Sequence, residues 1–277
     1  MKKLLRKIHF YYWLLIDFLW IFIKKNEGNN VVHSDFSIGI VTYVDRYDKF
    51  FKKLLRNIVV LFPNTEVIVA VNGYFDSEIQ TKYLGEVTCY GGQFKNVRLI
   101  TFNMPQSLSK LWNQLIIKSK NEKIFIFNDD IKISTLFKYF LLNSGILSEK
   151  FALINYSYSH FLISKSLIKL NGWFDERFPA VGNEDEDYEC RLVFNNVKVK
   201  SFRIFGIKNV VYLTKKFSYG KNVESINDKY VKSNKLFFDR KWEVSVESKE
   251  GFKYVRIIGK FVKLRDGMET PNFYPTL

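Results

Sequence analysis

A short apolar run that ends in two adjacent carboxylates constrains the fold of this chain more than any other feature. Residues 123–127 read Lys-Ile-Phe-Ile-Phe, a composition typical of a buried strand, and Asn128, Asp129 and Asp130 follow directly. Two aspartates at the end of a buried strand repel each other and lose hydration unless a cation lies between them. Mg²⁺ and Mn²⁺ prefer such oxygen ligands, and open α/β sheets bind ligands at the carboxyl ends of their strands. The pattern therefore predicts a cation site, with a solvated turn as the alternative.

The charge of the chain points to an anionic partner. Lysine and arginine number 43 against 28 acidic residues, which gives a formal net charge of +15 over 277 residues. Such a surplus suits nucleic acid, an anionic membrane surface or a phosphorylated substrate. The chain carries no nucleic-acid-binding motif, so we expect no nucleic-acid partner. Cys89 and Cys190 are the only cysteines and lie far apart in the sequence, which favours a reducing compartment.

The first 25 residues form a unit of their own. Basic residues at both ends flank an aromatic-rich apolar run at 8–23, which His9 and Asp17 interrupt. The run is shorter than the roughly 20 apolar residues of a spanning helix, and it lacks the cleavage signature of a signal peptide. Tryptophan and tyrosine favour the boundary between lipid and water. Residues 1–25 are therefore predicted to form a helix on, or shallowly inserted into, the anionic inner face of a membrane. The alternative is a buried terminal helix, and residues 26–34 are the predicted linker.

The residues after this linker alternate between strand and helix patterns. An apolar run at 36–43 is followed by a helical pattern at 49–61 and a second apolar run at 66–71. A strand, a helix and a strand at this spacing predict a parallel sheet with a right-handed crossover. Three glycines in residues 74–96 predict an irregular segment there. The elements expected next are a strand at 97–102 and a helix at 108–119.

A second acidic cluster follows a Gly-Trp-Phe-Asp-Glu segment at 172–176. Five acids occupy the six positions 184–189, in a protein that is basic overall. A helix that begins near Glu184 is stabilised by acids in its first turn through the helix dipole. This effect accounts for Glu186 and Glu189, whereas the position of the whole cluster directly after 172–176 favours a functional role.

Six short segments follow one another in an order that is informative as a set. They are Thr-Tyr at 42–43, Val-Asn-Gly at 71–73, Leu-Ser-Lys-Leu-Trp-Asn at 108–113, Asn-Asp-Asp at 128–130, Gly-Trp-Phe-Asp-Glu at 172–176 and Asn-Glu-Asp-Glu-Asp-Tyr at 183–188. This order resembles the family-2-like glycosyltransferases of the GT-A fold, of the bacterial surface-glycan type. The resemblance covers roughly Phe36 to Trp242. It implies an α/β fold with a GT-A-type nucleotide-sugar-binding sheet, mixed and mostly parallel and flanked by helices. The implied catalytic domain is 35–242, and 243–277 is a basic C-terminal extension.

The resemblance also implies an activity, that of an inverting, metal-dependent glycosyltransferase. The expected donor is a nucleotide-sugar, with a UDP-sugar as the first expectation, and the expected metal is Mn²⁺ or Mg²⁺. The expected acceptor is a glycolipid or lipid-linked saccharide, a lipooligosaccharide or a capsule-type glycan. The basic surface and the aromatic N-terminus then share one explanation, because both bring the enzyme to anionic lipid that carries the acceptor.

The family positions that bind the donor can be carried over residue by residue. They correspond to Thr42, Tyr43, Arg46, Asn72, Asn113 and Asp129, and the metal position corresponds to Asp130 together with Asp129. Two departures from the family pattern stand out, since Asn72 and Asn128 occupy positions where carboxylates are common. A third is the missing histidine after the second acidic cluster, where Lys215 or Lys216 is a candidate for neutralising the diphosphate.

The acceptor half of the site is assigned in the same way. Trp173, Asp175 and Glu184 match positions expected to bind the acceptor, with a core tryptophan as the alternative for Trp173. Asp185 matches the general base. An inverting transfer needs a carboxylate near the acceptor hydroxyl to take its proton, while a metal ion neutralises the leaving diphosphate. The chain supplies carboxylates for these two roles in two separate clusters.

Two other classes of function stay open on the sequence. A nucleotidyltransferase on a similar sheet is one, although such enzymes carry a glycine-rich phosphate loop after the first strand and this chain has Tyr-Val-Asp-Arg at 43–46. A non-catalytic, basic, membrane-associated binding protein is the other. Metal-dependent binding of one class of nucleotide counts against the latter, and salt-sensitive binding to any polyanion supports it.

Overall fold

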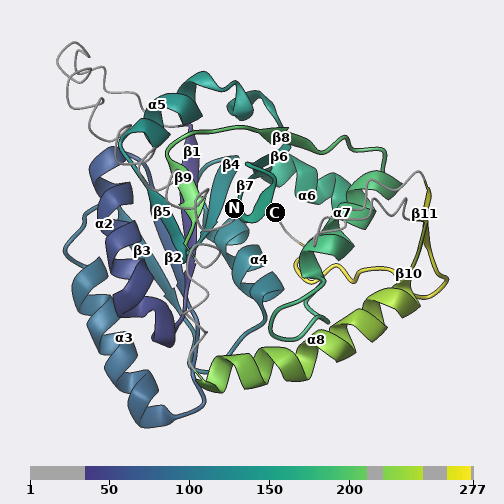
Figure 1. The fold of residues 1–277 in the computed structure, drawn as a ribbon, viewed down its shortest axis with the longest axis horizontal. Coiled ribbons are helices and arrows are strands. Elements are labelled where there is room, and N and C mark those ends of the chain that lie inside the picture. The colour runs from purple at the N-terminus through teal and green to yellow at the C-terminus, as the bar shows by residue number, and fades with distance from the viewer. Residues whose placement is uncertain (1–34, 211–220, 246–260, 276–277) are drawn as a thin grey trace, which may run out of the picture.

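The computed structural model describes residues 35–210, 221–245 and 261–275 (Figure 1). The predicted membrane-associating helix at 1–25, the linker at 26–34 and the candidate lysines Lys215 and Lys216 lie outside the described residues. None of the helices in the described ranges is long and apolar enough to cross a membrane.

Four parallel strands form one half of a seven-stranded sheet. The strand β1 (Phe36–Thr42) lies between β2 (Val67–Val71) and β4 (Lys123–Asn128), and β3 (Val97–Thr101) lies outside β2. Every residue of β1 and β2 is buried, because helices cover both faces of this part of the sheet. The strands predicted before Asp129 are confirmed.

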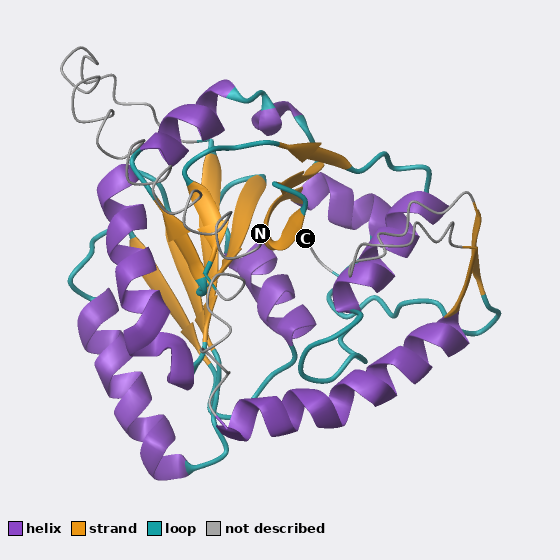
Figure 2. Cartoon of the chain, viewed as in Figure 1, coloured by secondary structure: helices purple, strands orange, loops and turns teal. Residues whose placement is uncertain are grey.

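Antiparallel pairing completes the sheet. The strand β7 (Ser157–Ser164) runs antiparallel to both β4 and β6 (Phe151–Ile154), and β8 (Lys200–Phe202) is parallel to β6. The strand order is β3-β2-β1-β4-β7-β6-β8, and four of its six pairings are parallel. This mixed, mostly parallel sheet flanked by helices confirms the predicted fold class (Figure 2). Two short ribbons lie beside it, β5 (Ile131–Ile133) with β9 (Ile207–Asn209), and β10 (Trp242–Ser245) with β11 (Phe261–Leu264).

Helices lie on both faces of the sheet (Figure 1). They are α2 (Lys52–Leu61), α3 (Ser77–Gly91), α4 (Leu108–Lys118), α5 (Leu136–Asn143), α6 (Lys165–Asn171), α7 (Glu184–Phe194) and α8 (Lys221–Lys241). A 3₁₀ turn (Val44–Arg46) and a π-helical turn (Tyr47–Phe51) connect β1 to α2. The helix predicted at 49–61 is thus present, with an irregular first turn.

The irregular segment predicted at 74–96 is wrong, because α3 occupies most of it. The Asp76 carboxylate caps this helix by accepting hydrogen bonds of 3.0 Å from the backbone N–H groups of Glu78 and Ile79. One of the glycines that suggested a loop has a packing role instead. A Cβ at Gly91 would lie 3.1 Å from a methyl group of Leu99, so glycine lets the end of α3 approach β3 closely.

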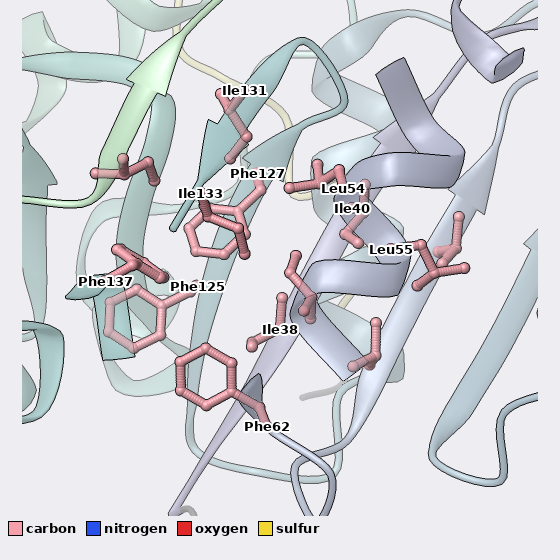
Figure 3. Packing of buried hydrophobic residues seen from close by; sticks show 14 of the residues in the cluster. Ile38, Ile40, Leu54, Leu55, Phe62, Phe125, Phe127, Ile131, Ile133 and Phe137 are labelled. Carbon is pink, nitrogen blue, oxygen red and sulfur yellow. The ribbon is translucent and has the colours of Figure 1, made fainter. Parts of the chain in front are cut away.

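The two faces of the sheet carry separate hydrophobic cores. Ile38 and Ile40 of β1 project toward α2 and pack near Leu54 and Leu55, together with aromatic side chains of β4 (Figure 3). The opposite face packs against α4, α6 and α7. Gly39 matters here, because a Cβ at this position would lie 3.0 Å from a methyl group of Leu115. The missing side chain therefore brings α4 close to β1, and with it the first turn of α4 to the carboxyl edge of the sheet.

The described part of the predicted C-terminal extension packs onto this domain. Phe273 and Tyr274 contact the core on the α4 side, and the carbonyl of Tyr274 accepts a 3.0 Å hydrogen bond from the indole N–H of Trp173. The carbonyl of Glu269 accepts another, of 2.8 Å, from Arg177. The division of the chain at residue 242 stays a prediction, but residues from beyond it are hydrogen-bonded to the 173–177 segment.

Candidate functional site

A cavity of about 750 Å³ opens at the carboxyl edge of the parallel strands. Its volume lies within the roughly 300–1,000 Å³ of small-molecule sites. The ends of β1, β2 and β4, the first turn of α4, the loop before α7 and Tyr230 of α8 form its wall. Its charged lining residues are Arg46, Lys110, Asp129, Asp130 and Glu176.

Six of the seven predicted donor and metal residues line this cavity, and five of them lie around the ends of β1 and β4. Thr42, Tyr43, Arg46, Asp129 and Asp130 all line it. Nη1 of Arg46 lies 2.9 Å from Oδ1 of Asp129 and 3.5 Å from Oδ2 of Asp130, while the backbone N–H of Tyr43 donates to Oδ2 of Asp129 at 3.3 Å. Because the carboxyl ends of neighbouring parallel strands share one edge, the loop after β1 reaches the acids that follow β4.

The two strand-end acids differ in how their oxygens are used. Burial raises the pKa of Asp129 to about 6, although the charge of Arg46 acts in the opposite direction. Both oxygens of Asp129 have protein partners. Oδ1 of Asp130 and Oδ1 of Asn128 are buried without a hydrogen-bond partner among the described residues. Unpartnered buried acceptors are costly unless a ligand satisfies them, so this pair of oxygens is the part of the cavity that suits a cation.

The described ranges contain no group of three His, Cys, Asp or Glu side chains arranged to hold a metal ion. The oxygens available to a metal ion are therefore Oδ1 of Asn128 and Oδ1 of Asp130. They lie next to the carboxylate of Asp129, whose two oxygens already have protein partners. This set fits Mg²⁺ or Mn²⁺, which keep several water molecules and take further oxygens from substrate phosphates rather than filling their shell from the protein. The oxygens present thus fit a metal that binds together with a phosphorylated ligand.

Asn72 also lines the cavity, and its amide fixes a neighbouring loop. Nδ2 donates to the carbonyl of Gln106 at 3.2 Å, and Oδ1 accepts from the backbone N–H groups of Gly73 and Gln106 at 2.9 and 2.8 Å. An aspartate here would have no N–H to donate to Gln106. This contact gives a physical reason for an asparagine, and not an aspartate, at this position. The predicted contact of Asn72 with a nucleotide stays a prediction.

Asn113 does not line the cavity, and its predicted contact with the donor stays a prediction. Its side chain is fully buried. Nδ2 donates to the carbonyl of Phe174 and to Oε1 of Glu176, both at 2.9 Å, and Oδ1 accepts from the N–H of Phe174 at 3.0 Å. The inward face of α4 therefore uses this amide to hold the 172–176 segment. Both polar atoms of the Asn113 side chain are bonded to that segment.

Trp173 and Asp175 are buried and do not line the cavity either, so their predicted contact with the acceptor stays a prediction. The Trp173 ring is 2% exposed and packs edge-on against Tyr274, with ring centroids 5.2 Å apart. Asp175 is fully buried and accepts hydrogen bonds from Arg177 and from Nζ of Lys241, the latter at 2.6 Å. Burial alone would raise the pKa of Asp175, but Arg177 and Lys241 outweigh it and hold that pKa at about 2. The two side chains lie in the core beneath the site and do not line the cavity.

Lys241 links Asp175 to the helix that carries the second acidic cluster. Its Nζ lies 2.6 Å from Oδ1 of Asp187 as well as 2.6 Å from Asp175, and all three side chains are fully buried. The indole N–H of Trp242 donates to the same oxygen of Asp187 at 2.8 Å, and Arg191 pairs with the other oxygen at 3.0 Å. The end of α8 and the first turn of α7 are thus joined through a buried network of charges.

Glu184 and Asp185 stand in the first turn of α7, directly after the loop that lines the cavity. Glu184 is 4% exposed and accepts a hydrogen bond from the N–H of Gly182. Burial, with the charge of Asp185 added, raises the pKa of Glu184 to about 8. Asp185 is half-buried, and burial together with the charge of Glu186 raises its pKa to about 6. Neither side chain lines the cavity, although Ala180 and Val181 do.

Two charged lining residues were missed by the sequence reasoning. Glu176 ends the Gly-Trp-Phe-Asp-Glu segment, so its place in a recognised motif is a signal that could have identified it. Lys110 lies in the first turn of α4, where the helix dipole disfavours a cation unless an anion is bound nearby. A lysine in the first turn of a predicted helix, just after a strand, is therefore a usable signal.

Comparisons with known proteins find likenesses at the level of solved structures. No family model and no curated protein sequence matches this chain. Solved structures that resemble it include S. aureus TarS (16% identity, TM-score 0.47, 61% of this chain and 35% of that one) and TarS residues 1–349 in complex with UDP-GlcNAc (14% identity, TM-score 0.46, 69% and 64%). Glucosyl-3-phosphoglycerate synthase from Mycobacterium tuberculosis, in complex with Mn²⁺, UDP and glucosyl-3-phosphoglycerate, is another (9% identity, TM-score 0.49, 73% and 78%). The chain spans about a third to two thirds of the TarS chains. With identities of 9–16% and TM-scores below 0.5, these likenesses concern the arrangement of the backbone alone.

Proposed function

We propose that this chain is a glycosyltransferase that takes its sugar from a nucleotide-sugar donor. The observation that carries the proposal is the cluster of Arg46, Asp129 and Asp130 at the carboxyl edge of the parallel strands. Nη1 of Arg46 lies 2.9 Å from Asp129 and 3.5 Å from Asp130. The cluster lies in a cavity of suitable size, beside the backbone of Tyr43 and the side chain of Asn72. The expected donor is a UDP-sugar, as the sequence resemblance implies.

A divalent metal ion, Mn²⁺ or Mg²⁺, is part of this proposal. Asp130 and Asn128 would hold it through their unpartnered oxygens, with Asp129 alongside. Such an ion, when bound, supplies positive charge that stabilises the departing diphosphate. The protein adds charges of its own. Lys110 lines the same cavity, and Arg46 fixes the two carboxylates in place.

Asp185 is the proposed general base of an inverting transfer. The acceptor oxygen attacks the anomeric carbon of the donor sugar, the bond from that carbon to the diphosphate breaks, and the carboxylate takes the acceptor proton. The position of Asp185, one turn beyond the loop 179–181 that lines the cavity, supports this role. Its raised pKa of about 6 also makes it a better proton acceptor than an ordinary aspartate, while it is still ionised at neutral pH.

The proposed acceptor is a glycolipid, a lipid-linked saccharide, a lipooligosaccharide or a capsule-type glycan, at the cytoplasmic face of a bacterial inner membrane. The support for this part is the formal net charge of +15 together with the aromatic and basic composition of residues 1–25, both suited to an anionic lipid surface. Glu184 is retained as an acceptor-side residue within this proposal, acting beside Asp185.

The test is transfer of a radiolabelled sugar. Purified protein is incubated with Mn²⁺, with labelled UDP-, GDP-, CMP- or dTDP-sugars, and with a bacterial lipid extract as the source of acceptor. We expect one class of nucleotide-sugar to label the extract, and Asp185→Asn to lose transfer while it still binds the nucleotide. Wild-type protein that is folded but transfers label from none of the donors would contradict the proposal.

A further inference from the structure

Glu176 is the one acid of the cavity wall, among the described residues, that comes from outside the strand-end pair. It belongs to the segment between α6 and α7, whereas Asp129 and Asp130 follow β4. Oε1 of Glu176 accepts hydrogen bonds of 2.9 Å from Nδ2 of Asn113 and of 2.6 Å from the hydroxyl of Tyr274. Within the described residues Oε2 has no hydrogen-bond partner. The protein therefore holds Oε1 of this carboxylate in place, and Oε2 can accept a hydrogen bond from a ligand.

Both anchors of Glu176 are themselves held firmly. Asn113 is fully buried and makes two further hydrogen bonds to the backbone of Phe174. Tyr274 packs edge-on against Trp173. Burial, with the neighbouring Glu176 added, raises the pKa of Tyr274 to about 12, so the phenol stays protonated and donates. A carboxylate fixed by supporting residues in this way is pre-organised for a ligand rather than free to turn away.

The charge of Glu176 limits which part of a ligand it can bind. No lysine or arginine in the described ranges forms an ion pair with it, so its two protein partners are neutral. An uncompensated carboxylate repels phosphate groups. It forms charge-assisted hydrogen bonds with hydroxyl groups, which are about twice as strong as those between neutral partners. The suitable ligand is therefore a neutral, hydroxyl-bearing group and not the diphosphate.

We propose that Oε2 of Glu176 accepts a hydrogen bond from a sugar hydroxyl bound in this cavity. This inference rests on the proposed function, since a glycosyltransferase cavity holds sugars from two sources, the donor and the acceptor. In either case Glu176 is a specificity-determining residue, and the C-terminal segment completes the site by supplying Tyr274.

The first arm of the test measures donor binding by isothermal titration calorimetry in the presence of Mn²⁺. The probes are UDP, UDP-glucose and UDP-GlcNAc, and the variant is Glu176→Gln. Glutamine keeps the size of the side chain, and its amide oxygen still accepts from Asn113 and Tyr274. If the hydroxyl belongs to the donor, the variant binds UDP like the wild type and binds the preferred UDP-sugar about 10- to 100-fold more weakly, as expected for a lost hydrogen bond to a charged group.

The second arm measures transfer to a panel of p-nitrophenyl glycosides. If the hydroxyl belongs to the acceptor, Glu176→Gln leaves all three donor-side affinities unchanged and raises the KM for the glycoside at least 10-fold, with a smaller change in kcat. Tyr274→Phe removes one anchor and should shift the same parameter in the same direction by less. Glu78→Gln, an exposed acid in the first turn of α3, is the matched control that should change neither arm.

Two results would overturn the inference. One is an equal loss of affinity for UDP and for the UDP-sugars in Glu176→Gln, which indicates general damage to the cavity. The other is a variant identical to the wild type in both arms. Failure of the proposed function looks different, because then the folded wild-type protein binds neither UDP nor a UDP-sugar.

Discussion

Nη1 of Arg46 lies 2.9 Å from Oδ1 of Asp129, so the loop after β1 closes over the carboxylate that follows the neighbouring strand β4. Arg46 is 17% exposed at its side chain and Asp129 only 1%, which makes the ion pair largely buried. The guanidinium also reaches Asp130 at 3.5 Å. The arginine thus compensates part of the negative charge that the two acids bring to the carboxyl edge.

Replacing Arg46 should destabilise the fold through the acids it leaves behind. In Arg46→Met two buried carboxylates lose their cation, and we expect the free energy of unfolding to fall by about 2–3 kcal/mol in urea titrations. The double variant Arg46→Met, Asp129→Asn should recover part of this loss, because one uncompensated charge is gone. Lys200→Met, which breaks an ion pair between partly exposed side chains, is the control and should cost less than about 1 kcal/mol. A double variant less stable than Arg46→Met would contradict this account of the pair.

Lys241→Met should destabilise the protein more severely. The change leaves Asp175 and Asp187 fully buried without the ammonium group that lies 2.6 Å from each. Breaking a buried ion pair by removing one partner typically costs about 3–5 kcal/mol, and we expect a loss of at least about 3 kcal/mol in chemical unfolding. Lys235→Met, which breaks an exposed pair with Asp239 on the same helix, should cost less than about 1 kcal/mol. Equal losses of unfolding free energy in Lys241→Met and Lys235→Met would show that the buried ion pairs stabilise the protein no more than an exposed pair does.

The parts of the fold and site that follow from local pattern could be predicted from the sequence. Runs of β-branched and aromatic residues identify β1, β2 and β4, and the shared edge of parallel strands brings Thr42 and Arg46 to Asp129. The placement of Trp173 and Asp175 outside the cavity lining could not be predicted, for a common reason. Trp173 and Asp175 are buried by Tyr274 and Lys241, which lie 101 and 66 positions further along the chain. No local pattern reports contacts at such separations, so a motif match alone could not distinguish a core residue from a ligand-binding one.

The helix α3 shows a second limit of pattern reading. Glycine is unfavourable inside helices, and the glycines near its end therefore suggested a loop. Glycine suits position 91 because a Cβ there would lie only 3.1 Å from the side chain of Leu99 in β3. Only the position of the neighbouring strand reveals that close approach.

His160 should make the stability of the protein depend on pH. It is 2% exposed on β7, and burial lowers the pKa of its imidazole from 6.5 to about 4. As the pH falls below 6.5, His160 is protonated in the unfolded chain but stays neutral in the folded chain. Protonation therefore favours the unfolded chain, and the stability present at neutral pH is lost between about pH 6.5 and pH 4. The difference corresponds to about 3 kcal/mol.

The measurement is the free energy of unfolding at several pH values between 7 and 4, for the wild type and for His160→Leu. Other groups titrate in this range as well, Asp129 among them, and they affect both proteins alike. We expect the wild type to lose about 3 kcal/mol more than the variant over this interval. Two curves that run parallel from pH 7 to pH 4 would contradict the assignment.

The central claim is that a nucleotide binds at the carboxyl edge of the parallel strands together with a metal ion held by Asp130. The most direct test is isothermal titration of the wild type and of Asp130→Ala with UDP, with and without Mn²⁺, preceded by a thermal-shift screen against UDP-, GDP-, CMP- and dTDP-sugars. The account predicts that one nucleotide class binds the wild type, that Mn²⁺ strengthens this binding, and that Asp130→Ala weakens the Mn²⁺-dependent binding by about 10-fold or more. A folded wild-type protein that binds none of the nucleotides, or an Asp130→Ala variant that binds with undiminished affinity in Mn²⁺, would contradict it.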